Sequence, residues 1–155
     1  MEDEISVERT LVIVKPDAMQ RGLAGEILAR LERRGLRFVG LKMIQITPEL
    51  AARHYAEHQG KGFYEGLVRH ITSTPVIVAA LEGPGAIAAV RQSMGVTRPV
   101  EAAPGSIRGD YALTVGFNLV HGSDAPESAE RELALFFQPD ELQSYSRDID
   151  RWVAE

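Results

Sequence analysis

Short apolar runs alternate with amphipathic segments along the chain. The first run, residues 10–14, ends at Lys15-Pro16-Asp17, where proline cannot continue a ladder and aspartate favours a turn. We therefore expect a buried strand there. Apolar residues at helical spacing then predict a helix over 22–34, and Gly35 is placed to end it in a left-handed conformation.

The next segments predict a strand followed by two helices. Residues 36–46 are rich in strand formers and stop at Thr47-Pro48, where threonine can cap a helix and proline can occupy its first position. A helix over 48–58 is broken by glycines, and helical spacing resumes over 63–72. This pair has the pattern of a helical hairpin.

The following pattern predicts a third strand over 75–83 and a small amphipathic helix over 86–94, closed by Gly95. Regular structure then stops. Residues 96–110 carry prolines and glycines with no period, and a loop of this length inside a compact domain is usually functional or disordered.

A fourth strand is predicted over 111–120, and Asp124 with Glu127 fits a capping box at the start of a last helix. The resulting order is β-α-β-(αα)-β-α-β-α. It predicts an α+β, ferredoxin-like βαββαβ fold: a four-stranded antiparallel sheet with its main helices on one face, extra helices and a C-terminal extension. We expect one domain over 1–155, with an N-terminal extension at 1–8 and a tail at 138–155 that packs on a neighbouring surface.

Composition narrows the possible functions. The 155 residues are 45% hydrophobic and 25% charged, which is ordinary for a globular protein, and the net charge of -5 gives no general attraction to nucleic acid. With no cysteine, disulfides, cysteine zinc sites and thiol catalysis are excluded. The acidic N-terminus lacks an apolar targeting region and the longest apolar run, 76–81, is too short for a membrane span, so we expect a cytoplasmic protein.

His121 lies between an apolar segment and the polar start of a helix, in the stretch "NLVHGSDAPESAE". A neutral imidazole has an unprotonated nitrogen near pH 7 and can act as a nucleophile if a partner such as Ser123 or Glu132 orients it. Asp124 could cap the helix or bind a metal through water. Spacing alone favours a histidine that only forms structural hydrogen bonds, and His54 and His70, beside charged neighbours on predicted helices, are expected at the surface. Met19, Met43 and Met94 are expected in packing positions.

Scattered cations could form an anion site. Lys15, Arg91 and Arg108, with Thr97 in the long loop, could bind phosphate oxygens, although each alone is more typical of a solvated surface cation. The chain has neither a GxxxxGK[ST] loop nor a GxGxxG motif, so side chains would have to replace backbone amides.

Several motifs, in order, resemble those of nucleoside diphosphate kinases from about Arg9 to Trp152. They are "RTLVIVKPDAMQRGLAGEI", "HYAEH", "GFYEGL", "PGSIRGDY" and "NLVHGSDAPESAE". The last block is highly specific. The resemblance implies ping-pong transfer, in which His121 takes the γ-phosphoryl group of a nucleoside triphosphate and passes it to a different nucleoside diphosphate.

The resemblance also implies roles for individual residues. Glu132 and Ser123 would hold the histidine, with Lys15 and Tyr55 also in the catalytic set. The nucleotide-binding set comprises Lys15 and Asn118 for the ribose, Phe63 and Val115 for the base, Leu67 for the apolar wall, and Tyr55, His58, Arg91, Thr97 and Arg108 for the phosphates. Asp17, Arg21 and Gly22 match structural positions.

Stacking on Phe63 needs only the π-face that every base presents, so little base specificity is expected, and ATP, GTP and their deoxy forms would all serve. Mg²⁺ is the implied cofactor, held mostly by the nucleotide, with Asp124 as its candidate ligand. The family forms tetramers or hexamers, and the extended tail favours a hexamer. Departures at Gly62, Val96, Arg98 and Val100 lie in or beside binding segments.

Two other functions are considered. One is a regulatory module of the same fold that binds a nucleotide without turnover, which the full set of matched residues disfavours. The other is nucleic-acid binding, which the acidic composition makes an unlikely activity, because duplex binding gains most of its affinity from phosphate neutralisation.

Overall fold

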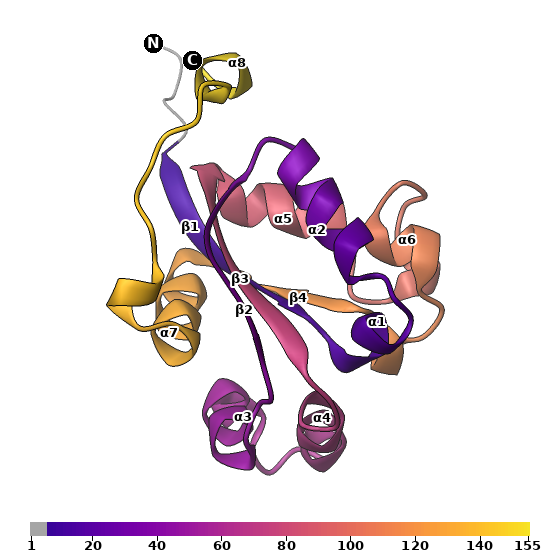
Figure 1. Ribbon diagram of the computed structural model, residues 1–155. Helices are drawn as coiled ribbons and strands as arrows, with labels where there is room; N and C mark the ends of the chain where they lie inside the picture. Colours follow the sequence, from indigo (N-terminus) through magenta and orange to yellow (C-terminus); the bar gives the residue numbers. More distant parts are fainter. Residues whose placement is uncertain (1–5) are drawn as a thin grey trace.

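The computed structural model describes residues 6–155 (Figure 1). Its sheet has the strand order β2-β3-β1-β4, and each neighbouring pair is antiparallel. This confirms the predicted α+β, ferredoxin-like fold. The strands are β1 (Val7–Val14), β2 (Arg37–Ile44), β3 (Val76–Pro84) and β4 (Val120–Gly122).

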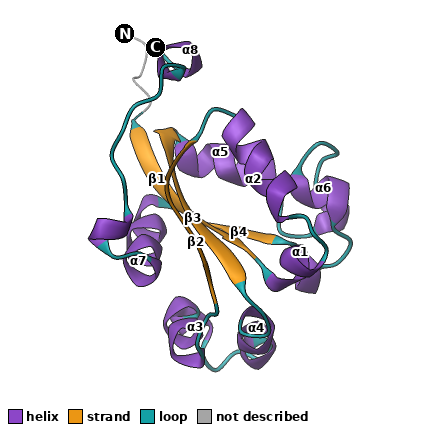
Figure 2. Cartoon of the chain, in the orientation of Figure 1, coloured by secondary structure: helices purple, strands orange, loops and turns teal. Residues whose placement is uncertain are grey.

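Helices cover both faces of the sheet (Figures 1 and 2). Two of them, α2 and α5, pack on one face, while α3, α4 and α7 pack on the other. The helices are α1 (Pro16–Gln20), α2 (Ala24–Arg33), α3 (Pro48–His54), α4 (Tyr64–Ile71), α5 (Ala86–Met94), α6 (Ile107–Tyr111), α7 (Pro126–Phe136) and α8 (Asp150–Val153). The extra helices therefore build the second face.

The uninterrupted apolar run of β1 follows from this double cover. Leu11, Val12, Ile13 and Val14 are all fully buried. Because successive side chains of a strand point to opposite faces, Val12 and Val14 enter the core under α2 and α5, whereas Leu11 and Ile13 enter the core under α3, α4 and α7. The strand that pairs with β4 is therefore fixed from both sides.

Two helix ends have the predicted chemistry. Thr47 caps α3 by accepting a hydrogen bond from the backbone N–H of Leu50 at 3.1 Å, and Pro48 occupies the first helical position. After α2, Gly35 has a φ of +115°, a value that side chains rarely adopt. Both predictions are confirmed.

Other local predictions are wrong. The expected turn at Lys15-Pro16-Asp17 is the start of α1, with Pro16 at its first position. The long loop after Gly95 contains a 3₁₀ turn at Pro99–Glu101 and α6. The capping box of Asp124 is not formed, because α7 begins at Pro126 after Ala125 and no side chain caps it.

The fourth strand is also wrong over most of its predicted length. Residue 111 ends α6, residues 115–117 form a 3₁₀ turn, and pairing with β1 is confined to β4. Leu119 explains the late start, since its φ of +76° breaks extended structure just before Val120. At the other end of the sheet, β1 begins at Val7, so Val7 and Glu8 belong to the sheet rather than to an extension. Of the rest of the predicted N-terminal extension, Ser6 lies outside regular structure before β1, and residues 1–5 lie outside the described residues.

The predictions of burial from sequence neighbours are wrong for two residues, His54, which was expected at the surface, and Met43, which was expected in a packing position. His54 is only 5% exposed, whereas Met43 is 65% exposed on the edge strand β2. His70 is half-buried and contacts Asp17 at 3.0 Å. Met19 and Met94 pack in the core as expected.

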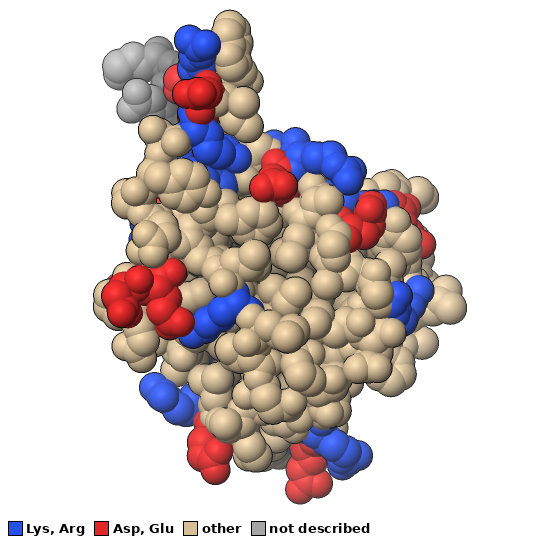
Figure 3. Space-filling model, in the orientation of Figure 1, with Lys and Arg blue, Asp and Glu red and all other residues tan. Residues whose placement is uncertain are grey.

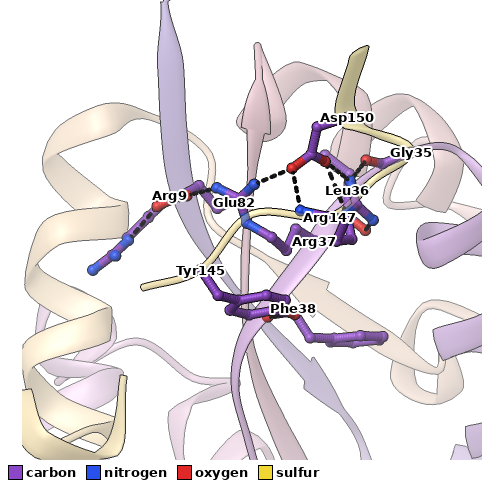
Figure 4. A network of polar contacts seen from close by, with 9 residues as sticks. All are labelled: Arg9, Gly35, Leu36, Arg37, Phe38, Glu82, Tyr145, Arg147 and Asp150. Carbon is purple, nitrogen blue, oxygen red and sulfur yellow. Dashed lines mark hydrogen bonds and ion pairs between the residues drawn. The ribbon is translucent and has the colours of Figure 1, made fainter. Parts of the chain in front are cut away.

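The C-terminal tail runs along the open edge of β2 (Figure 4). Arg147 donates to the backbone carbonyls of Gly35 at 2.7 Å and Leu36 at 3.2 Å, and Asp150 accepts from Arg37 at 2.8 Å. Arg37 in turn pairs with Glu82 of β3. The neighbouring surface on which the tail packs in this structure is therefore the edge of its own sheet.

The surface shows a mixed charge pattern. On the face seen in Figure 3, lysine and arginine side chains alternate with acidic ones around a largely uncharged area. Between residues 6 and 155, no helix combines the length and apolar character that a membrane span requires.

Candidate active site

His121 stands on β4 opposite Ile13 of β1, and its ring is held by a buried carboxylate. Its Nε2 lies 2.7 Å from Oε1 of Glu132 on α7. Burial alone would raise the pKa of Glu132, but hydrogen bonds from His121 and Ser123 hold it below its usual value. An ionised carboxylate can only accept, so Nε2 carries the proton and Nδ1 of the neutral ring keeps its lone pair.

Ser123 fixes this carboxylate from the other side. Its hydroxyl donates to the same Oε1 of Glu132 at 2.9 Å and accepts from the backbone N–H of Leu11 at 3.2 Å. Ser123 is fully buried and Glu132 is 4% exposed. The predicted trio of His121, Glu132 and Ser123 therefore forms one hydrogen-bonded chain anchored on the central strand.

Two cavities meet at His121. The larger, about 830 Å³, lies between α4, the 3₁₀ turn after α6 and the end of β1. The predicted site residues in its lining are Lys15, Tyr55, His58, Phe63, Leu67, Thr97, Val115, Asn118 and His121. The smaller cavity, about 160 Å³, has a more polar lining that includes Arg91, Asp124 and Glu132, and it shares Tyr55, His58 and His121 with the larger one.

The larger cavity has an apolar end and a polar end. Phe63 and Val115 are 54% and 52% exposed and both line this cavity, so they offer a ligand an apolar surface there. Deeper in the cleft, Lys15 donates to Oδ1 of Asn118 at 2.8 Å, and Nδ2 of Asn118 donates to the backbone carbonyl of Thr97 at 3.2 Å. This arrangement suits a ligand with an aromatic ring at one end and hydroxyl groups at the other.

Burial tunes two groups at the polar end. It lowers the pKa of Lys15 to about 8, helped by the nearby charge of Arg108, so Lys15 is still mostly a cation at pH 7. Burial, with the charge of Glu132, raises the pKa of Tyr55 to about 12. Tyr55 therefore keeps its proton and can donate a hydrogen bond into either cavity.

Arg108 is placed differently from the other predicted ligands. It is 4% exposed, and its guanidinium donates to the backbone carbonyls of Gly95, Asn118 and Val120 at 3.0, 3.1 and 2.6 Å. It contributes to the lining of neither cavity described above. Arg108 thus ties together the backbone on both sides of the cleft, and these three bonds leave two of its five N–H groups, one on each terminal nitrogen, for another acceptor.

Asp124 is the one predicted metal ligand. It lines the smaller cavity with Arg91 and His121, and the hydroxyl of Ser128 donates to it. This hydrogen bond is the main reason why the pKa of Asp124 is lowered, so its carboxylate is charged. Residues 6–155 contain no cluster of three acidic, histidine or cysteine ligands. One carboxylate beside a phosphate-sized cavity fits Mg²⁺ held mainly by phosphate oxygens.

The site also contains residues that the sequence did not single out. His54 lines the smaller cavity, and Phe117 and His70 line the larger one with their rings 5.3 Å apart. For His54 a signal was present, since it lies three residues after the buried Ala51 and so shares the buried face of α3. The exposure of Phe117 has no counterpart in the local sequence pattern.

Comparison with known proteins agrees with this geometry. The family model described as "Nucleoside diphosphate kinase" matches residues 8–142. A nucleoside diphosphate kinase of Thermomicrobium roseum is 63% identical over 95% of this chain and 99% of its own length, and one of Pelotomaculum thermopropionicum is 56% identical over 96% and 100%.

Solved structures give the same result. A halophilic nucleoside diphosphate kinase from Halobacterium salinarum in complex with CDP superposes with a TM-score of 0.94 at 53% identity, covering 97% of this chain and all of that one. A nucleoside diphosphate kinase family protein from Babesia bovis gives a TM-score of 0.92 at 44% identity, covering 94% and 99%. The chain belongs to the nucleoside diphosphate kinase family, whose enzymes transfer a phosphoryl group between nucleotides.

Proposed function

We propose that this enzyme works by a ping-pong mechanism through a phosphohistidine at His121. The observation that carries the proposal is the hydrogen bond between Nε2 of His121 and Glu132, on a ring that lines both cavities. With Nε2 protonated, Nδ1 is the nucleophilic atom. One cleft then serves donor and acceptor in turn.

In the first half-reaction, Nδ1 attacks the γ-phosphorus of a nucleoside triphosphate. The N–P bond forms as the bond from the γ-phosphorus to the bridging oxygen breaks, and the nucleoside diphosphate leaves with that electron pair. In the second, a terminal oxygen of another nucleoside diphosphate attacks the same phosphorus and the N–P bond breaks. The proton on Nε2 stays in place throughout, shared with Glu132, which stabilises the positive charge that the ring gains.

The cleft supplies positioning and charge neutralisation, which phosphoryl transfer mainly requires. Arg91 and the phenolic O–H of Tyr55 lie in the smaller cavity with the nucleophile, where the phosphoryl group would lie. Lys15 and Asn118 would bind the ribose. Phe63 and Val115 would hold the base by its faces, so ATP, GTP and their deoxy forms would all be accepted.

Mg²⁺ would supply further charge neutralisation on the phosphate oxygens. Asp124 is the residue that would hold it, directly or through water. Arg108 would act on the phosphates through the two N–H groups that its backbone bonds leave over. Burial, with help from the charge of Arg91, lowers its pKa to about 10, so its guanidinium is charged at pH 7.

The mechanism is tested with γ-labelled ATP. We expect acid-labile label on the protein that leaves as a new triphosphate when GDP is added. His121→Gln should abolish the label while the circular dichroism spectrum is unchanged. A His121→Gln protein that still takes up label would mean that another residue is the nucleophile, and no label on the parent protein would leave only nucleotide binding without turnover.

We also propose a homo-oligomer, a hexamer rather than a tetramer. The exposed Leu41 and Met43 on the edge strand β2 and the exposed Val100 in the long loop offer apolar area to other subunits. Multi-angle light scattering measures the mass directly, and a monomeric mass at micromolar concentration would contradict this.

A further inference from the structure

His54 is a buried histidine that touches the nucleophile. Its ring comes from the last residue of α3, lies 4.9 Å from the ring of His121 between centroids, and stands almost perpendicular to it at 86°. The rings of Phe136 and Tyr55 also pack against it, with centroid distances of 5.4 Å and 4.7 Å. His54 is thus wedged between α7 and β4, with its own orientation set by aromatic contacts.

This ring is neutral under ordinary conditions. Burial, followed by the charge of His121, lowers the pKa of His54 to about 3. Its Nδ1 is buried and has no hydrogen-bond partner among the described residues. A histidine that stays neutral near pH 7 and whose Nδ1 has no hydrogen-bond partner contributes little to stability by hydrogen bonding. Its shape and its contact with His121 therefore need another explanation.

The nucleophilic ring needs such a contact. The structure gives the His121 side chain one hydrogen bond, at Nε2, and leaves about 25% of the side chain exposed to the cavity. A single bond at one corner does not prevent an imidazole from tilting about that corner. A rigid neighbour standing against the ring removes this freedom, and a neutral one does so without repelling the positive charge that His121 gains on phosphorylation.

We propose that His54 is a positioning residue that holds the His121 imidazole in the orientation in which Nε2 bonds Glu132. This inference rests on the proposed function, because it assigns a use to the orientation of the nucleophile. It acts through His121 and needs no contact between His54 and substrate. The part that matters is the aromatic shape of His54 rather than its nitrogens.

The test compares His54→Ala, which removes the wedge, with His54→Phe, which keeps an aromatic ring of similar size. Leu31→Ala is the matched control, since Leu31 is fully buried but belongs to α2, on the opposite face of the sheet. Each variant is measured for kcat and KM with ATP and GDP. Two-bond ¹H–¹⁵N spectra of His121 are recorded without nucleotide, and thermal unfolding shows that each variant is folded.

We expect His54→Ala to lower kcat by about tenfold to about a hundredfold, the scale on which small misplacements of a reacting group act. KM should change by less than about twofold. The His121 ring nitrogens should shift towards a mixture of tautomers. His54→Phe should recover kcat and the single Nε2–H tautomer, and Leu31→Ala should lower the melting temperature while leaving kcat per folded molecule and the His121 spectrum unchanged.

Three results would overturn the proposal. These are a His54→Ala protein with unchanged kcat and spectrum, a His54→Phe protein as slow as His54→Ala, and a Leu31→Ala protein with the same loss of kcat per folded molecule. The spectra are taken on nucleotide-free protein, so they report the ring orientation even if His121 is not the nucleophile. Failure of the proposed function is seen separately, as label on His121→Gln.

Discussion

The carboxylate of Glu132 should control the rate at which His121 is phosphorylated. Glu132→Gln keeps the size and shape of the side chain but removes the charge that accepts hydrogen bonds from His121 and Ser123. The amide cannot stabilise the positive ring that forms as Nδ1 attacks the phosphorus. Because Glu132 is only 4% exposed, solvent screens this loss little.

The size of the effect follows from the bond that changes. A hydrogen bond to a charged group contributes about 1.5–3 kcal/mol, and each 1.36 kcal/mol of barrier is about tenfold in rate, so phosphorylation should slow by about 10- to 150-fold. The assay is single-turnover labelling with γ-labelled ATP in a quenched-flow instrument. Glu130→Gln is the matched control, because Glu130 lies on the same helix but is exposed. A Glu132→Gln protein that labels within about twofold of the parent rate would refute the role assigned to this carboxylate.

Three further outcomes are expected. Phe63→Ala should raise KM for GDP and CDP alike, by about 5- to 150-fold for a lost stacking contact of about 1–3 kcal/mol, and a loss restricted to one base would contradict base-tolerant stacking. KM for GDP should rise between pH 7 and 9, because Lys15 has a pKa lowered to about 8 and loses its charge over that range. Lys15→Met should abolish this pH dependence, and a pH dependence that persists in Lys15→Met would mean that another group causes it. Gly95→Ala should lower the melting temperature by several degrees in a thermal scan, because φ at Gly95 is +86° and a Cβ there would lie 2.5 Å from Oγ of Ser106. Gly25→Ala, which has open space at its Cβ, should not lower the melting temperature, and equal melting temperatures for the two variants would contradict the predicted strain at Gly95.

Apolar periodicity predicted the first three strands and most helices in their order along the chain, because these elements bury one or both faces. It failed at residues 111–120, where Val115 and Phe117 have strand-forming side chains that are exposed at the cleft. Residues that face a ligand cleft can look like strand residues in sequence, since both carry large apolar side chains. The left-handed Leu119 that delays β4 gives no signal, because leucine rarely adopts that conformation.

Part of the candidate site was predictable from the sequence, whereas the surroundings of Arg108 and His54 were not. The resemblance placed the trio of His121, Ser123 and Glu132, and the structure joins these residues by hydrogen bonds. It could not show that the guanidinium of Arg108 is engaged by backbone carbonyls, because those bonds depend on how the loop folds back on β4. His54 was missed because its charged neighbour Arg53 is exposed, and the exposure of one helical residue says little about the next.

The tail decides where the sheet can grow. An edge strand offers unpaired backbone on which strands of other molecules can assemble. Gln143, Tyr145 and Arg147 already bind the carbonyls of four residues between Gly35 and Val39. On the β2 side of the sheet, a further strand must therefore add at residues 40–44 or first displace the tail, so the tail limits uncontrolled polymerisation through this edge.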